Sequence, residues 1–145
     1  MLKRSALQTL GGLIGAAAVS GCLLGLDTEP GLGLLHSVVA EGEALPESTL
    51  AAGGTSAVTV SGQIVGKLPC DEVYGEVDVD GDELRVRITV NAERQFCAGI
   101  APTTFSYVAN ILNVKSGDRP IVVEYRYVGV DGANGVRLDT LVAVG

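Results

Sequence analysis

From about Thr55 onward, apolar and polar residues alternate along the chain with a period of two. The alternation comes in short stretches, and turn-forming segments such as SGDRP at residues 116–120 and DGANG at residues 131–135 separate several of them. Because successive side chains of a strand point to opposite faces, each stretch predicts a strand with one buried face. The positions that share such a face are Val58, Val60 and Ile64, then Val73, Val77 and Val79, then Leu84, Val86, Ile88 and Val90, then Phe105, Tyr107, Ala109 and Ile111, then Ile121, Val123, Tyr125 and Tyr127, and finally Val136, Leu138, Thr140, Val142 and Val144.

Six or seven short strands at this spacing predict an all-β fold, an antiparallel β-sandwich of Ig-like architecture over residues 55–145. The likeness to antibody domains is one of architecture alone, because the chain contains no Trp. Many Gly, Val and Thr residues with few aromatic ones also favour strands and turns over helices. The sequence therefore predicts one β domain and no second one.

The clearest local prediction is a hairpin around Asp80-Gly81, a dipeptide that favours two-residue turns because both residues tolerate positive φ. With these two residues as the loop, apolar residues meet apolar ones and acids meet bases across the two strands. The expected register pairs Val79 with Asp82, Val77 with Leu84, Glu76 with Arg85, Tyr74 with Arg87 and Val73 with Ile88.

Residues 22–54 differ from this pattern, since they are rich in Gly, Ala, Ser, Glu and Pro and show little periodicity. Few aromatic residues and scattered acids are typical of segments that do not build a core. We therefore expect a flexible acidic tether over residues 22–54, with at most a short helix at residues 34–44. The single His of the chain, His36, is expected to be a solvated residue of this tether.

The first 22 residues have the layout of a signal peptide. Lys3 and Arg4 form a basic start, residues 10–19 are uncharged and mostly apolar, and Val19-Ser20-Gly21-Cys22 is a run of small residues that ends in a cysteine. This run resembles the lipobox of prokaryotic lipoprotein precursors, although Leu is commoner than Val at the position of Val19. The resemblance implies removal of residues 1–21 by cleavage between Gly21 and Cys22, lipidation of Cys22, and a membrane anchor made of acyl chains.

Two other interpretations of this segment are open. In one, an ordinary secretory signal is cut nearby and Cys22 has no role. In the other, residues 5–26, which carry no charge, form an uncleaved membrane helix, for which they are just long enough. Five Gly residues within that stretch and the lack of a basic cluster after Leu26 favour the lipoprotein interpretation. The pair Lys3-Arg4 leaves both the general secretory and the twin-Arg export routes open.

The chain is acidic, and its formal net charge of −7 becomes −9 when Lys3 and Arg4 are removed with residues 1–21. Such a surface repels nucleic acid and anionic lipid, so we expect neither as a ligand. With Lys scarce beside Arg and acids outnumbering both, the composition resembles that of lipoproteins of haloarchaeal type, from salt-loving archaea. An acidic bacterial lipoprotein would have the same composition.

The chain has three cysteines, Cys22, Cys70 and Cys97. If Cys22 carries the lipid, two remain, and two thiols outside the cytoplasm usually form a disulfide. We therefore expect a Cys70–Cys97 bridge, against the alternative of two free buried thiols.

The sequence predicts no catalytic residues, no metal site and no cofactor. A Ser-His-Asp or Cys-His site needs a rigidly held His, and His36 falls in the predicted tether. The acidic run from Glu76 to Glu83 superficially resembles a calcium-binding loop, but Arg87 falls where that loop needs a bidentate carboxylate. The hairpin is therefore favoured, with at most weak cation binding by Asp80, Asp82 and Glu83.

Three arginines, Arg85, Arg87 and Arg126, together with Tyr74, lie on the polar side of the predicted strands. They form either a face that binds a partner or, as we favour, a solvated sheet face with cross-strand salt bridges.

The function predicted from these features is an exported, lipid-anchored cell-envelope protein that faces outside the cytoplasm and acts as a binding or interaction module, with an envelope protein or surface ligand as its partner. Loops of such a sandwich are the usual contact sites, and the candidates are residues 91–101, 113–120 and 131–135. The alternatives are a structural envelope component and a hydrolase that uses carboxylates, for which no particular pair stands out.

Overall fold

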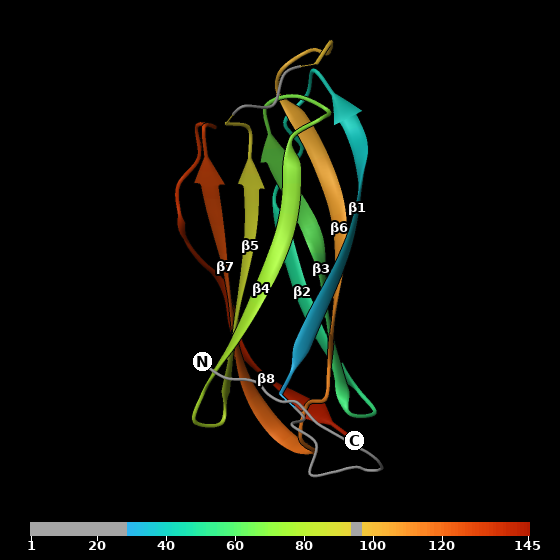
Figure 1. The fold of residues 1–145 in the computed structure, drawn as a ribbon, viewed down its shortest axis with the longest axis vertical. Coiled ribbons are helices and arrows are strands. Elements are labelled where there is room, and N and C mark those ends of the chain that lie inside the picture. Colours follow the sequence, from blue (N-terminus) through green and yellow to red (C-terminus); the bar gives the residue numbers. More distant parts are fainter. Residues whose placement is uncertain (1–28, 94–96) are drawn as a thin grey trace, which may run out of the picture.

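The computed structural model describes residues 29–93 and 97–145, which form two four-stranded β-sheets packed face to face (Figure 1). This part of the chain contains no helix, and therefore none that could cross a membrane. The strands are β1 (Gly31–Glu41), β2 (Ser48–Gly54), β3 (Ala57–Gly66), β4 (Glu72–Asp80), β5 (Glu83–Asn91), β6 (Thr103–Leu112), β7 (Gly117–Val128) and β8 (Gly135–Val144).

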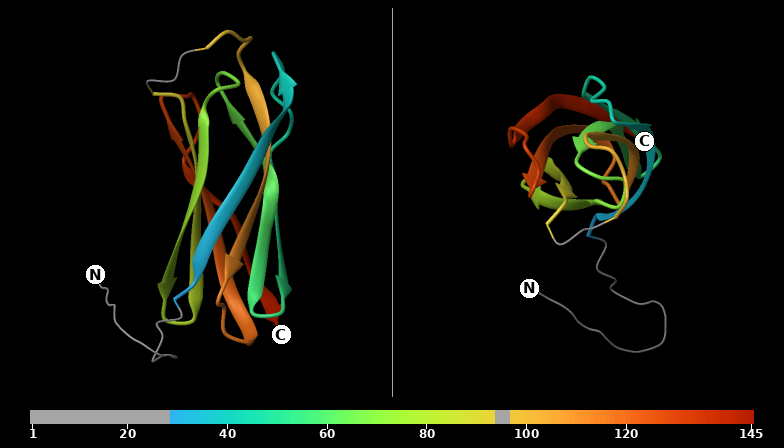
Figure 2. Two further views of the ribbon diagram at one scale, coloured as in Figure 1. Left: turned by 45° about the vertical axis from the view of Figure 1, so that its right-hand side comes forward. Right: turned by 90° about the horizontal axis from the view of Figure 1, so that it is seen from above.

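The predicted all-β sandwich is confirmed, with eight described strands instead of six or seven. One sheet has the order β1-β6-β3-β2 and the other the order β4-β5-β7-β8. All neighbouring strands are antiparallel except β5 and β7, which run parallel. Figure 2 shows the two sheets curving around a common core when the molecule is seen from above.

The core consists of the inward faces of β3, β5, β6 and β7, which the period-two pattern predicts. Val58, Ile64, Phe105 and Ile121 are among the side chains with no exposure to solvent. Burying apolar area of this kind is the main term that stabilises such a domain. The prediction fails at the start of β8, where Val136 is exposed because a β-bulge shifts the register between Val123 and Glu124 of β7.

The predicted flexible tether over residues 22–54 is wrong for its larger part, because β1 and β2 lie within it and form the two edges of one sheet. The short helix expected at residues 34–44 is likewise strand β1, and His36 lies on that strand. Leu32 and Leu34 of β1 pack against the core although they are only partly buried. Residues 1–28, with Gly21, Cys22 and the predicted cleavage site, lie outside the described residues.

The hairpin between β4 and β5 is confirmed, but its register is shifted by two residues from the predicted one. The loop is Gly81-Asp82, so that Asp80 pairs with Glu83 and Glu76 pairs with Arg87. Gly81 has a φ of +64°, as the first central residue of a type II′ turn requires, and this fixes the loop one position later than expected. A shift of two keeps every side chain on its predicted face.

The strands run along one axis, so all connections gather at two opposite ends (Figures 1 and 2). At one end lie Pro30, where the chain enters β1, and the short connections of residues 55–56, 81–82 and 113–116. We call this the entry end. At the other lie the connections of residues 42–47, 67–71 and 129–134 and the described residues 92–93 and 97–102 of the β5–β6 connection. We call this the loop end.

Candidate functional site

The loop end contains most of the irregular backbone in the described part of the chain. Two of the predicted contact loops, residues 91–101 and 131–135, reach it, whereas residues 113–120 lie at the entry end and partly belong to β7. The loops of residues 42–47 and 67–71 are part of the same end, but the sequence does not predict them as contact sites. Residues 42–47 fall in the predicted tether.

The Cys70–Cys97 bridge links two of these loops. The Cα atoms of the two residues lie 6.2 Å apart, within the range that a disulfide spans. The predicted pairing is therefore supported, and it joins the β3–β4 loop to the β5–β6 loop. Next to it, the buried Asp71 accepts hydrogen bonds at Oδ2 from the backbone N–H groups of Lys67 (2.5 Å) and Leu68 (3.2 Å), which fixes the β3–β4 turn.

Backbone hydrogen bonds fasten the β1–β2 loop to the β5–β6 loop. The N–H of Gly42 donates to the carbonyl oxygens of Ile100 (3.0 Å) and Pro102 (2.7 Å). In return, the N–H of Ile100 donates to Oε2 of Glu41 (2.9 Å). The hydroxyl of Thr104 donates to the carbonyl of Glu43 (2.8 Å). Three of the four loops are thus cross-linked into one unit.

An open depression of about 420 Å³ lies between the two sheets at this end. Lys67 on one side and Asp131 on the other supply its charged groups, and Pro102, Gly129 and Val130 are among its other lining residues. Both charged residues are exposed. The depression therefore offers one cation and one anion to a ligand.

A polar cluster joins the β1–β2 loop to the β4-β5-β7-β8 sheet. Glu47 accepts a hydrogen bond at Oε1 from Nε of Arg137 (2.8 Å) and another at Oε2 from the hydroxyl of Tyr127. The guanidinium of Arg137 also lies over the ring of Tyr125, 5.3 Å from its centre. The Tyr125 hydroxyl contacts that of Tyr107 (2.7 Å) between the sheets.

Burial by itself raises the pKa of the Glu47 carboxyl. The hydrogen bonds from Arg137 and Tyr127 and the charge of Arg137 together outweigh it, so the pKa lies below its usual value. Burial raises the pKa of Tyr127, and the hydrogen bond to Glu47 raises it further. A general acid needs a raised carboxyl pKa, whereas the pKa of Glu47 is lowered. The ionised carboxylate instead binds Arg137 and Tyr127 and holds the β1–β2 loop against the other sheet. We call these three residues the clamp.

We expect Glu47→Gln to lower the midpoint of urea unfolding at pH 7. The pKa of Glu47 is lower in the folded protein than its ordinary value of 4.5. Ionised Glu47 therefore stabilises the fold above pH 4.5, and this stabilisation is lost as the pH falls through the pKa of the folded state. The difference in unfolding midpoint between variant and wild type should therefore narrow below about pH 4.5. Glu43→Gln, at an exposed position of the same loop, is the control and should behave as wild type. A constant difference from pH 7 to pH 3 would contradict this role.

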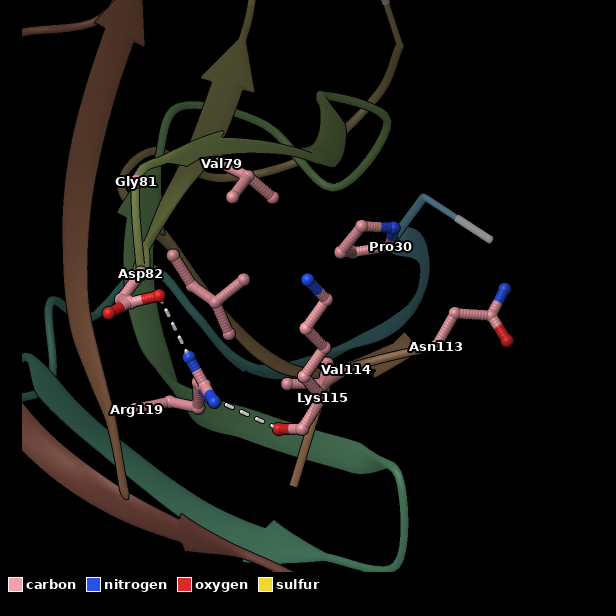
Figure 3. Close-up of a pocket in the computed structure, with 9 residues that line it drawn as sticks. Pro30, Val79, Gly81, Asp82, Asn113, Val114, Lys115 and Arg119 are labelled. Carbon is pink, nitrogen blue, oxygen red and sulfur yellow. Dashed lines mark hydrogen bonds and ion pairs between the residues drawn. The ribbon is translucent and has the colours of Figure 1, made fainter. Parts of the chain in front are cut away.

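The entry end has a smaller hollow of about 100 Å³ (Figure 3). The Asp82–Arg119 ion pair (3.2 Å) lies on one side of it, and Pro30 and Asn113 lie on the other. Arg119 also donates to the carbonyl oxygens of Lys115 (3.1 Å) and Ser116 (2.8 Å). The guanidinium of Arg119 is thus bound to both the β4–β5 turn and the β6–β7 connection. These contacts have a structural role, because they join the two connections.

No protein-family model, curated protein or solved structure matches this chain. What its sites can bind therefore follows from their own residues. Within residues 29–93 and 97–145, no three His, Cys, Asp or Glu side chains are grouped as metal ligands. The acidic run of the β4–β5 hairpin is instead paired with arginines, Asp80 and Glu83 with Arg85 and Asp82 with Arg119.

The predicted polar face is the outer face of the second sheet. Arg87 on β5 pairs with Glu76 on β4 (3.5 Å) and with Glu124 on β7 (3.1 Å). Cross-strand salt bridges of this kind agree with the solvated sheet face that the sequence favours. His36 lies on β1 and packs edge-on against Phe105, with 5.8 Å between ring centres.

Proposed function

We propose that this protein is an exported lipoprotein, anchored through Cys22, that presents the loop end of its β-sandwich to a partner outside the cytoplasm. The observation that supports the proposal is the position of the entry end. Pro30 and the loop end lie at opposite ends of the strands (Figure 1). An anchor at the N-terminus therefore directs the loop end away from the membrane.

The distance between anchor and domain is short in this proposal. Glu29, the first described residue, lies seven positions after Cys22, and a chain of that length spans at most about 25 Å. The domain then stands close to the membrane with its strands pointing outward. The loop end is the part of the surface that a partner reaches first.

The loop end also has the rigidity that a contact surface needs. The Cys70–Cys97 bridge and the bonds of Gly42 to the β5–β6 loop hold three loops in one arrangement. A surface that is ordered before binding loses less conformational entropy when the partner binds. The exposed Ile100, with 65% of its surface accessible, is an apolar contact point at the same end as the charged residues Lys67 and Asp131.

The anchor is tested by expressing the wild type and Cys22→Ser in a host that exports and lipidates proteins. We expect the wild type to fractionate with membranes and to lose residues 1–21 while gaining the mass of the lipid. The Cys22→Ser variant should lack the lipid mass. If its signal peptide is cleaved it should leave the membrane fraction, and otherwise it should keep residues 1–21. An identical mass and fractionation for the two proteins would contradict the anchor.

The contact surface is tested by placing a photo-cross-linking amino acid at Ile100, on the loop end, and at Lys115, on the entry end, of the full chain in intact cells. Both positions are exposed. We expect heterologous cross-links from position 100, identified by mass spectrometry, and few from position 115. Equal cross-linking at both ends would contradict the role of the loop end and leave the anchor result unaffected.

A further inference from the structure

The outer face of the β1-β6-β3-β2 sheet carries no ionisable group. It is formed by alternate residues of the four strands, at odd positions of 31–37 and 57–65 and at even positions of 106–112 and 48–54. These positions hold only Gly, Ala, Val, Leu, Ser, Thr, Asn and Gln. We call this surface the neutral face.

Large apolar side chains stand exposed on the neutral face. Leu35, Val108, Ser61 and Leu50 lie in one row across all four strands, because they are consecutive partners in the register. Leu35 is 80%, Leu50 69% and Val108 42% exposed. A contiguous exposed surface of this kind on a soluble domain marks an interaction site.

The other sheet has the opposite character. On its outer face β4 alone presents four carboxylates, at Glu72, Glu76, Asp78 and Asp80. The whole chain has a net charge of −7, so the charges concentrate away from the neutral face. Such a separation is not needed for folding, since an outward sheet face tolerates charged residues equally well.

We propose that the neutral face is where two copies of this chain associate, sheet against sheet. Two acidic copies repel one another wherever carboxylates meet, and this face is free of that repulsion. A partner with a charged surface would have to bury charges without counter-ions against it, which is costly. The matching surface must therefore be uncharged, and the same face of a second copy fulfils this condition.

The size of the neutral face agrees with a dimer interface. Four strands about 4.8 Å apart, with seven to nine residues of each in the face at about 3.4 Å per residue, cover roughly 490 Å² in projection. Side chains roughen this area, so its accessible surface approaches the roughly 800 Å² per partner of a standard interface. The polar groups are neutral, and some already pair within the face, as Thr59 and Asn110 do (3.1 Å).

The pairing is of the self-complementary, two-fold type. A two-fold axis near the middle of the row brings Val108 of one copy close to Val108 of the other, because β6 is one of the two central strands. If the axis runs along the strands, both entry ends face the same side, so two anchored copies can associate on one membrane.

The experiment measures the mass of the full chain carrying Cys22→Ser, which prevents association through lipid, by sedimentation velocity at 0.15 M and 1 M NaCl. We expect a dimer with a dissociation constant in the micromolar range. The dimer should not weaken at high salt, because salt screens the repulsion between the acidic surfaces outside the interface of the two copies. Adding Val108→Lys should weaken the dimer at least about 100-fold, because each interface then buries two unpaired charges.

The matched control is Leu141→Lys, at a position that is 64% exposed and lies on the outer face of the other sheet. It should leave the dimer intact, and circular dichroism checks that both variants are folded. A monomeric parent chain would overturn the proposal. A dimer that survives Val108→Lys would also overturn it, because the contact would then lie elsewhere. So would a dimer that dissociates with Leu141→Lys. Dissociation at 1 M NaCl would indicate a charged interface and would also overturn it.

Discussion

Replacing both Cys70 and Cys97 with Ser should lower the free energy of unfolding by about 3–4 kcal/mol, as the loop-entropy relation gives for a bridge that closes a loop of this size. The two residues are 27 positions apart in the sequence. For a domain of this length the midpoint of thermal unfolding should fall by about 10 °C or more. Differential scanning calorimetry of the purified wild type and double variant measures the change.

The third cysteine provides the control for this experiment. Cys22→Ser leaves the Cys70–Cys97 bridge in place and should not change the unfolding temperature of the domain. Alkylation of the native protein without reductant, followed by peptide mapping, checks the bridge itself. An unchanged unfolding temperature in the double variant, or alkylated Cys70 and Cys97 in the native wild type, would contradict the stabilising role.

The second large effect is expected from Gly53→Ala. A Cβ atom on Gly53 would overlap the backbone carbonyl oxygen of Ala143, where the end of β2 lies against the end of β8. Backbone hydrogen bonds tie the same ends together, from the N–H of Gly145 to Gly54 (2.9 Å) and from the N–H of Ser56 to Gly145 (3.0 Å). Neither strand can move away alone. We therefore expect the free energy of unfolding to fall by about 3 kcal/mol, at the upper end of what overpacking costs.

Gly33→Ala is the matched control, since Gly33 also lies on an edge strand of the same sheet. A Cβ atom there would meet nothing within 4 Å. The free energy of unfolding should be unchanged or rise by up to about 1 kcal/mol, because alanine restricts the unfolded chain. Urea unfolding measures the free energy of unfolding of both variants. Equal values for Gly53→Ala and Gly33→Ala would show that the contact between β2 and β8 does not constrain the fold.

The fold class and most inward-facing positions could be predicted from the sequence, because charged or polar residues alternate with large apolar ones in β4, β5 and β7. The edge strands β1 and β2 could not be recognised in this way. Their outward positions hold Gly, Ala, Ser and Leu, so the alternation is weak. The signal in the sequence is the alternation of Leu32 and Leu34 with Gly31 and Gly33.

The candidate site could be predicted only in part. The disulfide followed from the number of cysteines and the expected compartment. The clamp of Glu47 with Tyr127 and Arg137 joins residues that are 80 and 90 positions apart, and one sequence contains no signal for such pairs. The available indication was that Tyr125 and Tyr127 lie on a predicted buried face, where their hydroxyls need partners.

The position of β1 has a mechanical consequence. This strand follows the N-terminal segment directly and pairs with β6 along its whole length. With the proposed anchor at the entry end and the proposed partner at the loop end, a pull between them would act along β1, parallel to its axis. The backbone hydrogen bonds between β1 and β6 then resist in shear, all at once, instead of opening one after another from an end. The strand that borders the N-terminal segment is thus arranged to hold the domain under tension.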